Sequence, residues 1–200
     1  MDWIADIAAL EALYGTPGPA AARRVADRLT PDYRRWVEAS RFCILSTVGP
    51  EGTDASPRGD DGPVVRVLDE LHLALPDWKG NDRIDSLRNV VRDPRASLMF
   101  LVPGSGNVVR VNGEARLTAD AAFCESFAHQ GKRPRSVLVL RIHEVYFQCA
   151  RAILRSRLWG GEAPAGLPTP GQILAGLTAG EVGGPDYDRE WPERARGSLW

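Results

Sequence analysis

The stretch of sequence that decides the fold is ASLMFLVPGSGNVVRVNGEARL, residues 96–117. Residues 96–102 are almost entirely apolar, which is typical of a strand in the middle of a sheet. The proline and glycines of residues 103–107 indicate a hairpin connection. Residues 108–117 alternate in part between apolar and polar side chains, and Gly113 marks a position for a β-bulge. The stretch therefore predicts a central pair of strands.

Further strand-like segments lie on both sides of this pair. Residues 42–48 are rich in β-forming side chains and end in a turn cluster at residues 49–52, and residues 136–149 form the last long run of Val, Leu and Ile. We expect shorter strands at 64–68 and 71–75. Residues 53–63 are polar and glycine-rich and are assigned no strand, and the segment 76–81 is expected to be a loop.

Helical patterns lie at the start of the chain, between strands and near the end. Thr30 and Pro31 fit an N-cap and a first helical position, and Asn81 or Asp82 could cap the amphipathic helix that follows. The expected helices are 3–13, 20–29, 32–39, 83–92, one opening at 118–120, 150–159 and 170–177. The resulting order lacks the regular alternation of a doubly wound sheet. It favours a mainly β fold with α-helices, a small closed or split antiparallel barrel with covering helices.

The length of 200 residues suits a single domain, 1–200. We divide it into an N-terminal helical extension (1–40), a barrel (41–159) and a C-terminal tail (160–200). Apart from 170–177, we expect the tail to be irregular and to pack on the body or on a partner subunit.

Composition excludes several classes of function. Lys and Arg total 25 against 26 Asp and Glu, so the net charge of −1 gives no bulk basic field for nucleic acid. Three cysteines and three histidines form neither a disulfide framework nor a zinc motif. The chain has no basic leader and no apolar run of about 18 residues. We therefore expect a soluble, cytoplasmic protein without a membrane span.

Two segments could bind an anion. Lys79-Gly80-Asn81-Asp82-Arg83 follows a strand and opens a helix, where free backbone N–H groups favour a phosphate. The alternative is a solvated loop with a capped helix. The second segment, Ser56-Pro57-Arg58-Gly59-Asp60, could place Arg58 over an anion with Ser56 as a donor, or could be a plain turn.

Three further groups carry polar or aromatic side chains. Arg66 stands in an apolar run and faces either solvent or a ligand cavity. Arg110 and Asn112 share one strand face, which either contacts a flat heterocyclic ligand or forms part of a polar rim of the barrel. Residues 151–159 could offer arginines to phosphate and Trp159 to an aromatic ring, or could form an interface helix.

Residues 42–159 resemble the FMN-binding split β-barrel proteins of the pyridoxamine 5′-phosphate oxidase-like kind. The segments that carry the resemblance are FCILSTVGPEG (42–52), SPRGD (56–60), VLDE (67–70), LALPDWKGN (73–81), SLRN (86–89), DPRASLMF (93–100), VRVNGEA (109–115) and the closing strand 137–146. Within this family, three segments are similar to a subgroup of FMN-dependent enzymes with unassigned substrates: Pro103-Gly104, Arg110-Val111-Asn112-Gly113 and residues 149–159.

The resemblance implies a homodimer with FMN at the subunit interface. Lys79 matches the basic residue that holds the flavin phosphate, with Arg83 and either Arg58 or Arg66 as partners, and the strand bearing Asn112 would approach the flavin. The candidate cofactor-binding residues are Ser56, Arg58, Arg66, Lys79, Asn81, Arg83 and Asn112.

The chain departs from the oxidase itself in its C-terminal segment, which reads RARGSLW, and at Asn107-Val108, where the oxidase has a glutamine. We therefore expect an FMN-dependent oxidoreductase that transfers hydride to or from another small organic substrate, with NAD(P)H as a candidate electron donor. No catalytic side chain is then required, because the flavin carries the chemistry. The alternatives are a non-catalytic flavin carrier, a haem-binding barrel using His72, His129 or His143, and an interaction module.

Overall fold

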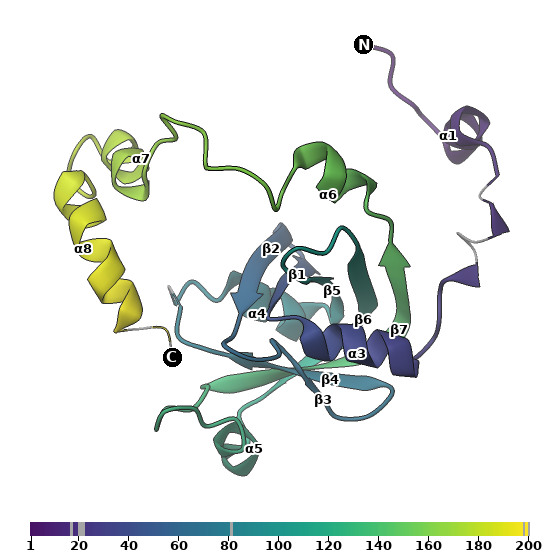
Figure 1. The fold of residues 1–200 in the computed structure, drawn as a ribbon, viewed down its shortest axis with the longest axis horizontal. Coiled ribbons are helices and arrows are strands. Elements are labelled where there is room, and N and C mark those ends of the chain that lie inside the picture. The colour runs from purple at the N-terminus through teal and green to yellow at the C-terminus, as the bar shows by residue number, and fades with distance from the viewer. Residues whose placement is uncertain (17, 20–22, 81, 198, 200) are drawn as a thin grey trace.

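The computed structural model of the chain is shown in Figure 1, and we describe residues 1–16, 18–19, 23–80, 82–197 and 199. Its centre is an antiparallel sheet with the strand order β2-β1-β5-β6-β7-β4-β3. The strands are β1 (Phe42–Gly49), β2 (Gly52–Gly59), β3 (Arg66–Val67), β4 (His72–Asp77), β5 (Arg95–Leu101), β6 (Val108–Thr118) and β7 (Ser136–Gln148). The helices are α1 (Ile7–Tyr14), α3 (Pro31–Ala39), α4 (Asp85–Arg92), α5 (Ala121–Glu125), α6 (Arg151–Ser156), α7 (Pro170–Leu177) and α8 (Pro185–Arg196).

The predicted central pair is confirmed, with β5 between β1 and β6. The predicted bulge is confirmed as well, since the register of β6 against β7 shifts between Asn112 and Gly113. A Cβ at Gly113 would overlap the carbonyl oxygen of Arg141, so only glycine lets the two backbones approach there.

No strand was predicted in the polar segment 53–63, which is wrong for residues 53–59, whereas residues 60–63 lie outside any strand. Residues 52–59 form β2, which pairs with β1 along its whole length and lies at one edge of the sheet. An edge strand tolerates polar residues and Pro57, because one row of its backbone groups needs no partner. Strand β4 likewise runs through Pro76 to Asp77, beyond the predicted end at Leu75.

The sheet curls into a split barrel. Residues at the end of β2 contact residues at the end of β4, although β1, β5, β6 and β7 lie between these strands in the sheet order. The core fills the interior of the curl. Cys43 and Leu45 of β1 are fully buried, whereas Ile44 between them is partly exposed, which is the two-residue period of a strand with one buried face. Fully buried side chains from the other strands include Leu73, Leu98, Phe100, Val111, Leu140 and Val145.

Helix α3 begins as predicted, with Pro31 in its first turn and the Thr30 hydroxyl accepting a hydrogen bond from the Tyr33 N–H. The predicted cap of α4 is wrong. Residue 81 lies outside the described residues, and the helix begins at Asp85 after Ile84, which has a left-handed φ of 54°. The predicted helix 20–29 is also wrong for its described part from residue 24, where Ala26 instead bridges to Val145 of β7.

The end of the chain is more helical than predicted. Helix α7 has the predicted bounds and a capping box between Thr169 and Gln172. Helix α8, however, was missed, because Pro192 interrupts its sequence pattern. Figure 1 shows α1 on one side of the barrel and α7 with α8 on the opposite side. Neither α1 nor α8 buries a residue against the described body. In the described part of the chain, no helix is long and apolar enough to cross a membrane.

Candidate cofactor site

A cavity of about 550 Å³ lies where β2 and β4 meet. Its walls come from the end of β2, the end of β4 with the following loop, the start of α4 and the residues just before β7. We call this cavity the seam cavity. Its volume falls within the range of roughly 300–1,000 Å³ that is usual for ligand and cofactor sites.

An ion pair between Arg58 and Asp77 crosses the seam. Arg58 Nη1 donates to Asp77 Oδ1 at 2.5 Å, and both side chains are only 19% exposed. The pair positions the guanidinium at the cavity wall. Arg58 Nε is buried and has no hydrogen-bond partner among the described residues. A buried N–H donor without a partner costs free energy, so it favours a ligand that accepts a hydrogen bond.

Two more cations line the seam cavity. Lys79 follows β4, is exposed, and makes no hydrogen bond or ion pair among the described residues. Arg135 comes from the segment before β7 and pairs with Asp82 at 3.0 Å. Arg58 and Arg135 are thus each matched by a carboxylate, whereas Lys79 adds one uncompensated positive charge. The cavity can therefore accept an anion.

The structure brings together three of the predicted site residues. Ser56, Arg58 and Lys79 all line the seam cavity. Asn81 lies outside the described residues, so its predicted role stays a prediction. Arg66, Arg83 and Asn112 do not line the seam cavity within one subunit, and their predicted roles in cofactor binding stay predictions.

Arg66 lines a second cavity, on β3, where Nη1 and Nη2 donate to the hydroxyl and the carbonyl of Ser126. Arg83 pairs with Asp85 at 2.9 Å and lines a third cavity beside α4. Arg83 and Lys79 are close in sequence but line different cavities. The left-handed backbone at Asp82 and Ile84 turns the chain between them and accounts for this separation.

Asn112 shares a face of the sheet with Arg110, as predicted, but its side chain is already satisfied. Its Oδ1 accepts from Ser97 Oγ at 2.6 Å, and its Nδ2 donates to Glu144 Oε1 at 2.6 Å. Arg110 lies over the ring of Tyr146, 5.4 Å from the centroid. Within one subunit these residues form a polar network across β5, β6 and β7, away from the seam cavity.

The segment 150–159 is helical only at Arg151–Ser156. Arg157 adopts a left-handed φ of 51° and ends the helix. Trp159 Nε1 donates to the carbonyl of Ser105 at 2.5 Å. This bond fastens the segment to the β5–β6 connection.

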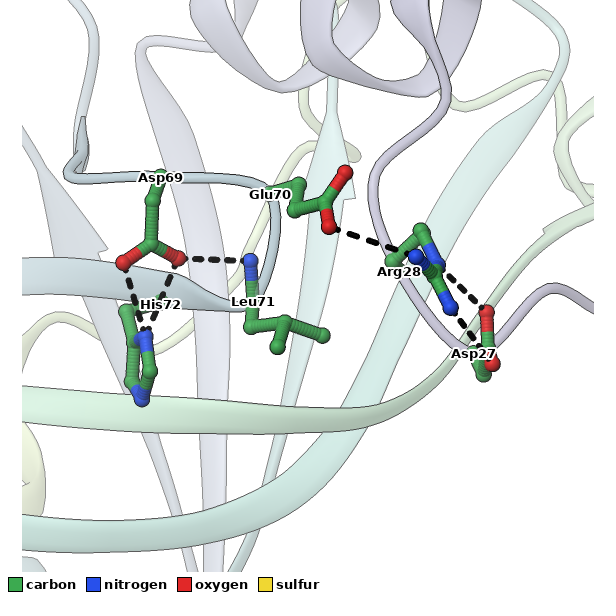
Figure 2. Close-up of polar contacts among 6 residues, drawn as sticks. All are labelled: Asp27, Arg28, Asp69, Glu70, Leu71 and His72. Atoms are coloured by element: carbon green, nitrogen blue, oxygen red, sulfur yellow. Dashed lines mark hydrogen bonds and ion pairs between the residues drawn. The ribbon is translucent and has the colours of Figure 1, made fainter.

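The histidines are dispersed in the structure. Figure 2 shows His72 Nδ1 against both carboxylate oxygens of Asp69, each at 3.0 Å. The hydrogen bond from the Leu71 N–H, and to a smaller extent that from the His72 ring, hold the pKa of Asp69 below its usual range. The same turn is tied to the N-terminal segment, because Glu70 accepts from Arg28, which also binds Asp27 (Figure 2). His72 therefore has a structural role in this turn.

Metal and thiol chemistry find little support. Within the described ranges no three His, Cys, Asp or Glu side chains gather as metal ligands would. Burial raises the pKa of Cys43 to about 12, despite the opposing effect of Arg58, so this thiol stays protonated at neutral pH.

Sequence reasoning missed two residues of the seam cavity, Asp77 and Arg135. Asp77 stood in a predicted loop, and only the approach of β2 to β4 makes it the partner of Arg58. For Arg135 a signal was present, since Lys132, Arg133 and Arg135 form a short basic run before the last strand. Nothing in the sequence, however, places that run beside Lys79.

The curled sheet, with a cation-lined cavity at its seam, defines a split-barrel protein. Residues 29–149, more than half of the chain, match the family model for pyridoxamine 5′-phosphate oxidase, and the chain belongs to this family. A search of curated proteins finds no match.

Several solved structures are similar to the barrel. HupZ of Group A Streptococcus is 15% identical, with a TM-score of 0.47 over 58% of this chain and 91% of that chain. General Stress Protein 26 of Bacillus anthracis is 13% identical, with a TM-score of 0.43 over 57% and 88%. An FMN-binding protein of Syntrophomonas wolfei is 15% identical, with a TM-score of 0.43 over 57% and 86%.

Proposed function

We propose that the protein is an FMN-dependent oxidoreductase that holds its flavin in the seam cavity and acts on a small organic substrate by hydride transfer. The observation that carries the proposal is the cation set of this cavity. Arg58 presents a buried Nε without a partner, and Lys79 has no partner among the described residues. Family membership supports a flavin as the ligand.

The residues present fit a flavin phosphate. A phosphate needs a few charge-assisted donors at short range, which Arg58, Lys79 and Arg135 can supply. Asp77 holds the Arg58 guanidinium in place beforehand, so little side-chain entropy is lost when the phosphate binds. Leu75, Pro76 and Trp78 add apolar and aromatic surface for the rest of the cofactor. When bound, FMN supplies the hydride chemistry, and the protein supplies binding and orientation.

We also propose that the protein works as a homodimer with FMN at the subunit interface. Supporting this is the polar network of Asn112, Ser97 and Glu144, whose side chains are only partly buried within one subunit. Light scattering coupled to gel filtration measures the mass directly. A monomer in the presence of saturating FMN would contradict the dimer.

The experiment that tests the function is a titration of cofactor-free protein with FMN, followed by anaerobic addition of NADPH. We expect flavin fluorescence to be quenched at a stoichiometry of one FMN per chain. Bleaching of the flavin band by NADPH, and its return with an electron acceptor, would support an enzyme. Flavin that binds but is never reduced would indicate a carrier. Protein that binds haemin with a Soret band but takes up no FMN would overturn the proposal.

A further inference from the structure

A second cavity, about 470 Å³ in volume, lies directly beside the seam cavity, because Pro76 and Trp78 line both. Its walls combine apolar residues of and around β3 with Phe127, and one guanidinium, that of Arg66, stands among them. We call it the Arg66 pocket. Its volume is that of a small-molecule site.

The Arg66 side chain is fixed in place by two kinds of contact. Nη1 donates to Ser126 Oγ and Nη2 to the Ser126 carbonyl, both at 2.8 Å. The guanidinium carbon lies 3.6 Å from the centroid of the Phe127 ring, which is a close cation–π arrangement. A guanidinium has five N–H donors, so the two bonds to Ser126 leave others available to a ligand.

Two carboxylates, those of Glu38 and Asp60, also line the Arg66 pocket, and each accepts hydrogen bonds from other groups. Glu38 accepts from Arg34 Nε at 2.9 Å. Asp60 accepts from Trp78 Nε1 at 2.8 Å and from the Asp61 N–H at 2.7 Å. Among the described residues Arg66 donates hydrogen bonds only to the uncharged groups of Ser126 and forms no ion pair, so no bonded carboxylate neutralises its guanidinium. His129 lines the same pocket.

We propose that the Arg66 pocket binds the substrate of the flavin reaction and that this substrate is a small planar carboxylate. The carboxylate pairs with Arg66, as the fork of N–H donors favours. The flat body packs against Phe127 and Trp78, whose rings line the pocket. This inference rests on the proposed function, because the shared wall at Trp78 sets the pocket next to the proposed flavin.

Benzoate, the simplest aromatic carboxylate, tests the pocket, with benzamide as its uncharged counterpart. Each is titrated by calorimetry into full-length protein, with and without FMN. We expect benzoate to bind at least about tenfold more tightly than benzamide, as befits a hydrogen bond to a charged group. Arg66→Gln should lower benzoate affinity to the level of benzamide, and Arg66→Lys, which keeps the charge but loses the planar fork, should fall between. Arg35→Gln, the same change at an arginine 80% exposed on α3, should leave benzoate affinity at the wild-type value.

Equal affinities for benzoate and benzamide, no benzoate binding, or wild-type affinity in Arg66→Gln would each overturn the inference. Circular dichroism of the variants confirms that they fold. FMN titration in parallel separates this inference from the proposed function. A protein that binds FMN but not benzoate keeps the flavin assignment and loses the carboxylate pocket. A protein that binds benzoate through Arg66 but not FMN keeps the pocket and loses the proposed function, together with the substrate role.

Discussion

Arg58 of β2 and Asp77 of β4 form an ion pair at 2.5 Å that joins two strands on opposite sides of the sheet order. Both side chains are mostly buried, so water screens their attraction less than at an exposed site. The pair has two effects. It closes the seam of the split barrel, and it fixes a guanidinium at the wall of the seam cavity.

A double-mutant cycle separates these two effects. Arg58→Gln should lower the free energy of unfolding by about 1–3 kcal/mol, because it leaves Asp77 without its partner. The same variant should weaken FMN binding at least about tenfold. Adding Asp77→Asn should restore much of the stability but not the FMN affinity. Urea denaturation and FMN fluorescence titration measure the two quantities. Wild-type FMN affinity in the double variant would remove Arg58 from the cofactor site.

Lys79 tests the phosphate end of the site. Lys79→Ala should weaken FMN binding by about 1.5–3 kcal/mol, which is the range for a hydrogen bond to a charged group. Lys132→Ala is the matched control, because Lys132 is the only other lysine of the chain and does not line the seam cavity. Fluorescence titration of both variants gives the affinities. Equal losses in the two variants would mean that Lys79 acts only through net charge.

The cysteines should differ in reactivity toward a thiol reagent such as DTNB at pH 8. Cys149 is exposed and should react quickly, whereas Cys43 is buried with a pKa of about 12 and should stay protected. Cys124 is also buried. We therefore expect one fast thiol in the folded protein and three after unfolding. Cys149→Ser should abolish the fast phase, and a persisting fast phase would show that another cysteine is accessible.

Gly113 should be intolerant of any side chain. Gly113→Ala should lower the free energy of unfolding by about 1–3 kcal/mol, because the new Cβ meets the Arg141 carbonyl oxygen at the bulge. Gly62→Ala serves as the control, since nothing lies within 4 Å of its Cβ position. Chemical denaturation of both variants checks the difference. If both variants had the stability of the wild type, the two strands would not approach as closely as described.

Asp93 gives a stability contribution that depends on pH. Hydrogen bonds from Arg95, first from its side chain and second from its backbone N–H, lower the pKa of Asp93 to about 2 in the folded protein. A depressed folded pKa stabilises the protein above the unfolded value of about 3.9, and this contribution is lost as the pH falls toward the folded value. The stability difference between wild type and Asp93→Asn should thus be constant from about pH 5 to 7 and shrink toward pH 2. Denaturation at several pH values measures it, and a difference that grew on acidification would contradict the pairing.

Several elements could be predicted from the sequence because their causes are local. The apolar run of β5, the cap at Thr30 and the bulge at Gly113 each follow from side-chain pattern or backbone freedom at the residue itself. Arg58 and Lys79 could likewise be predicted as candidate anion-binding cations, because each lies in a short local segment of polar residues and glycine. Edge strand β2 was missed because polar residues and a proline are tolerated where one side needs no pairing.

Apart from β2, the sequence by itself determined the strands, their approximate bounds and the presence of scattered cations. Only the tertiary structure decided which cations share a site. The curl of the sheet brings Arg58 to Asp77 and places Lys79 near Arg135, residues that are far apart along the chain. A left-handed turn at Ile84 sends Arg83 to another cavity, and Ser126 with Phe127 holds Arg66 in the neighbouring pocket. Long-range packing of the strands decides which of these cations lie close together, and no local pattern of residues encodes that packing.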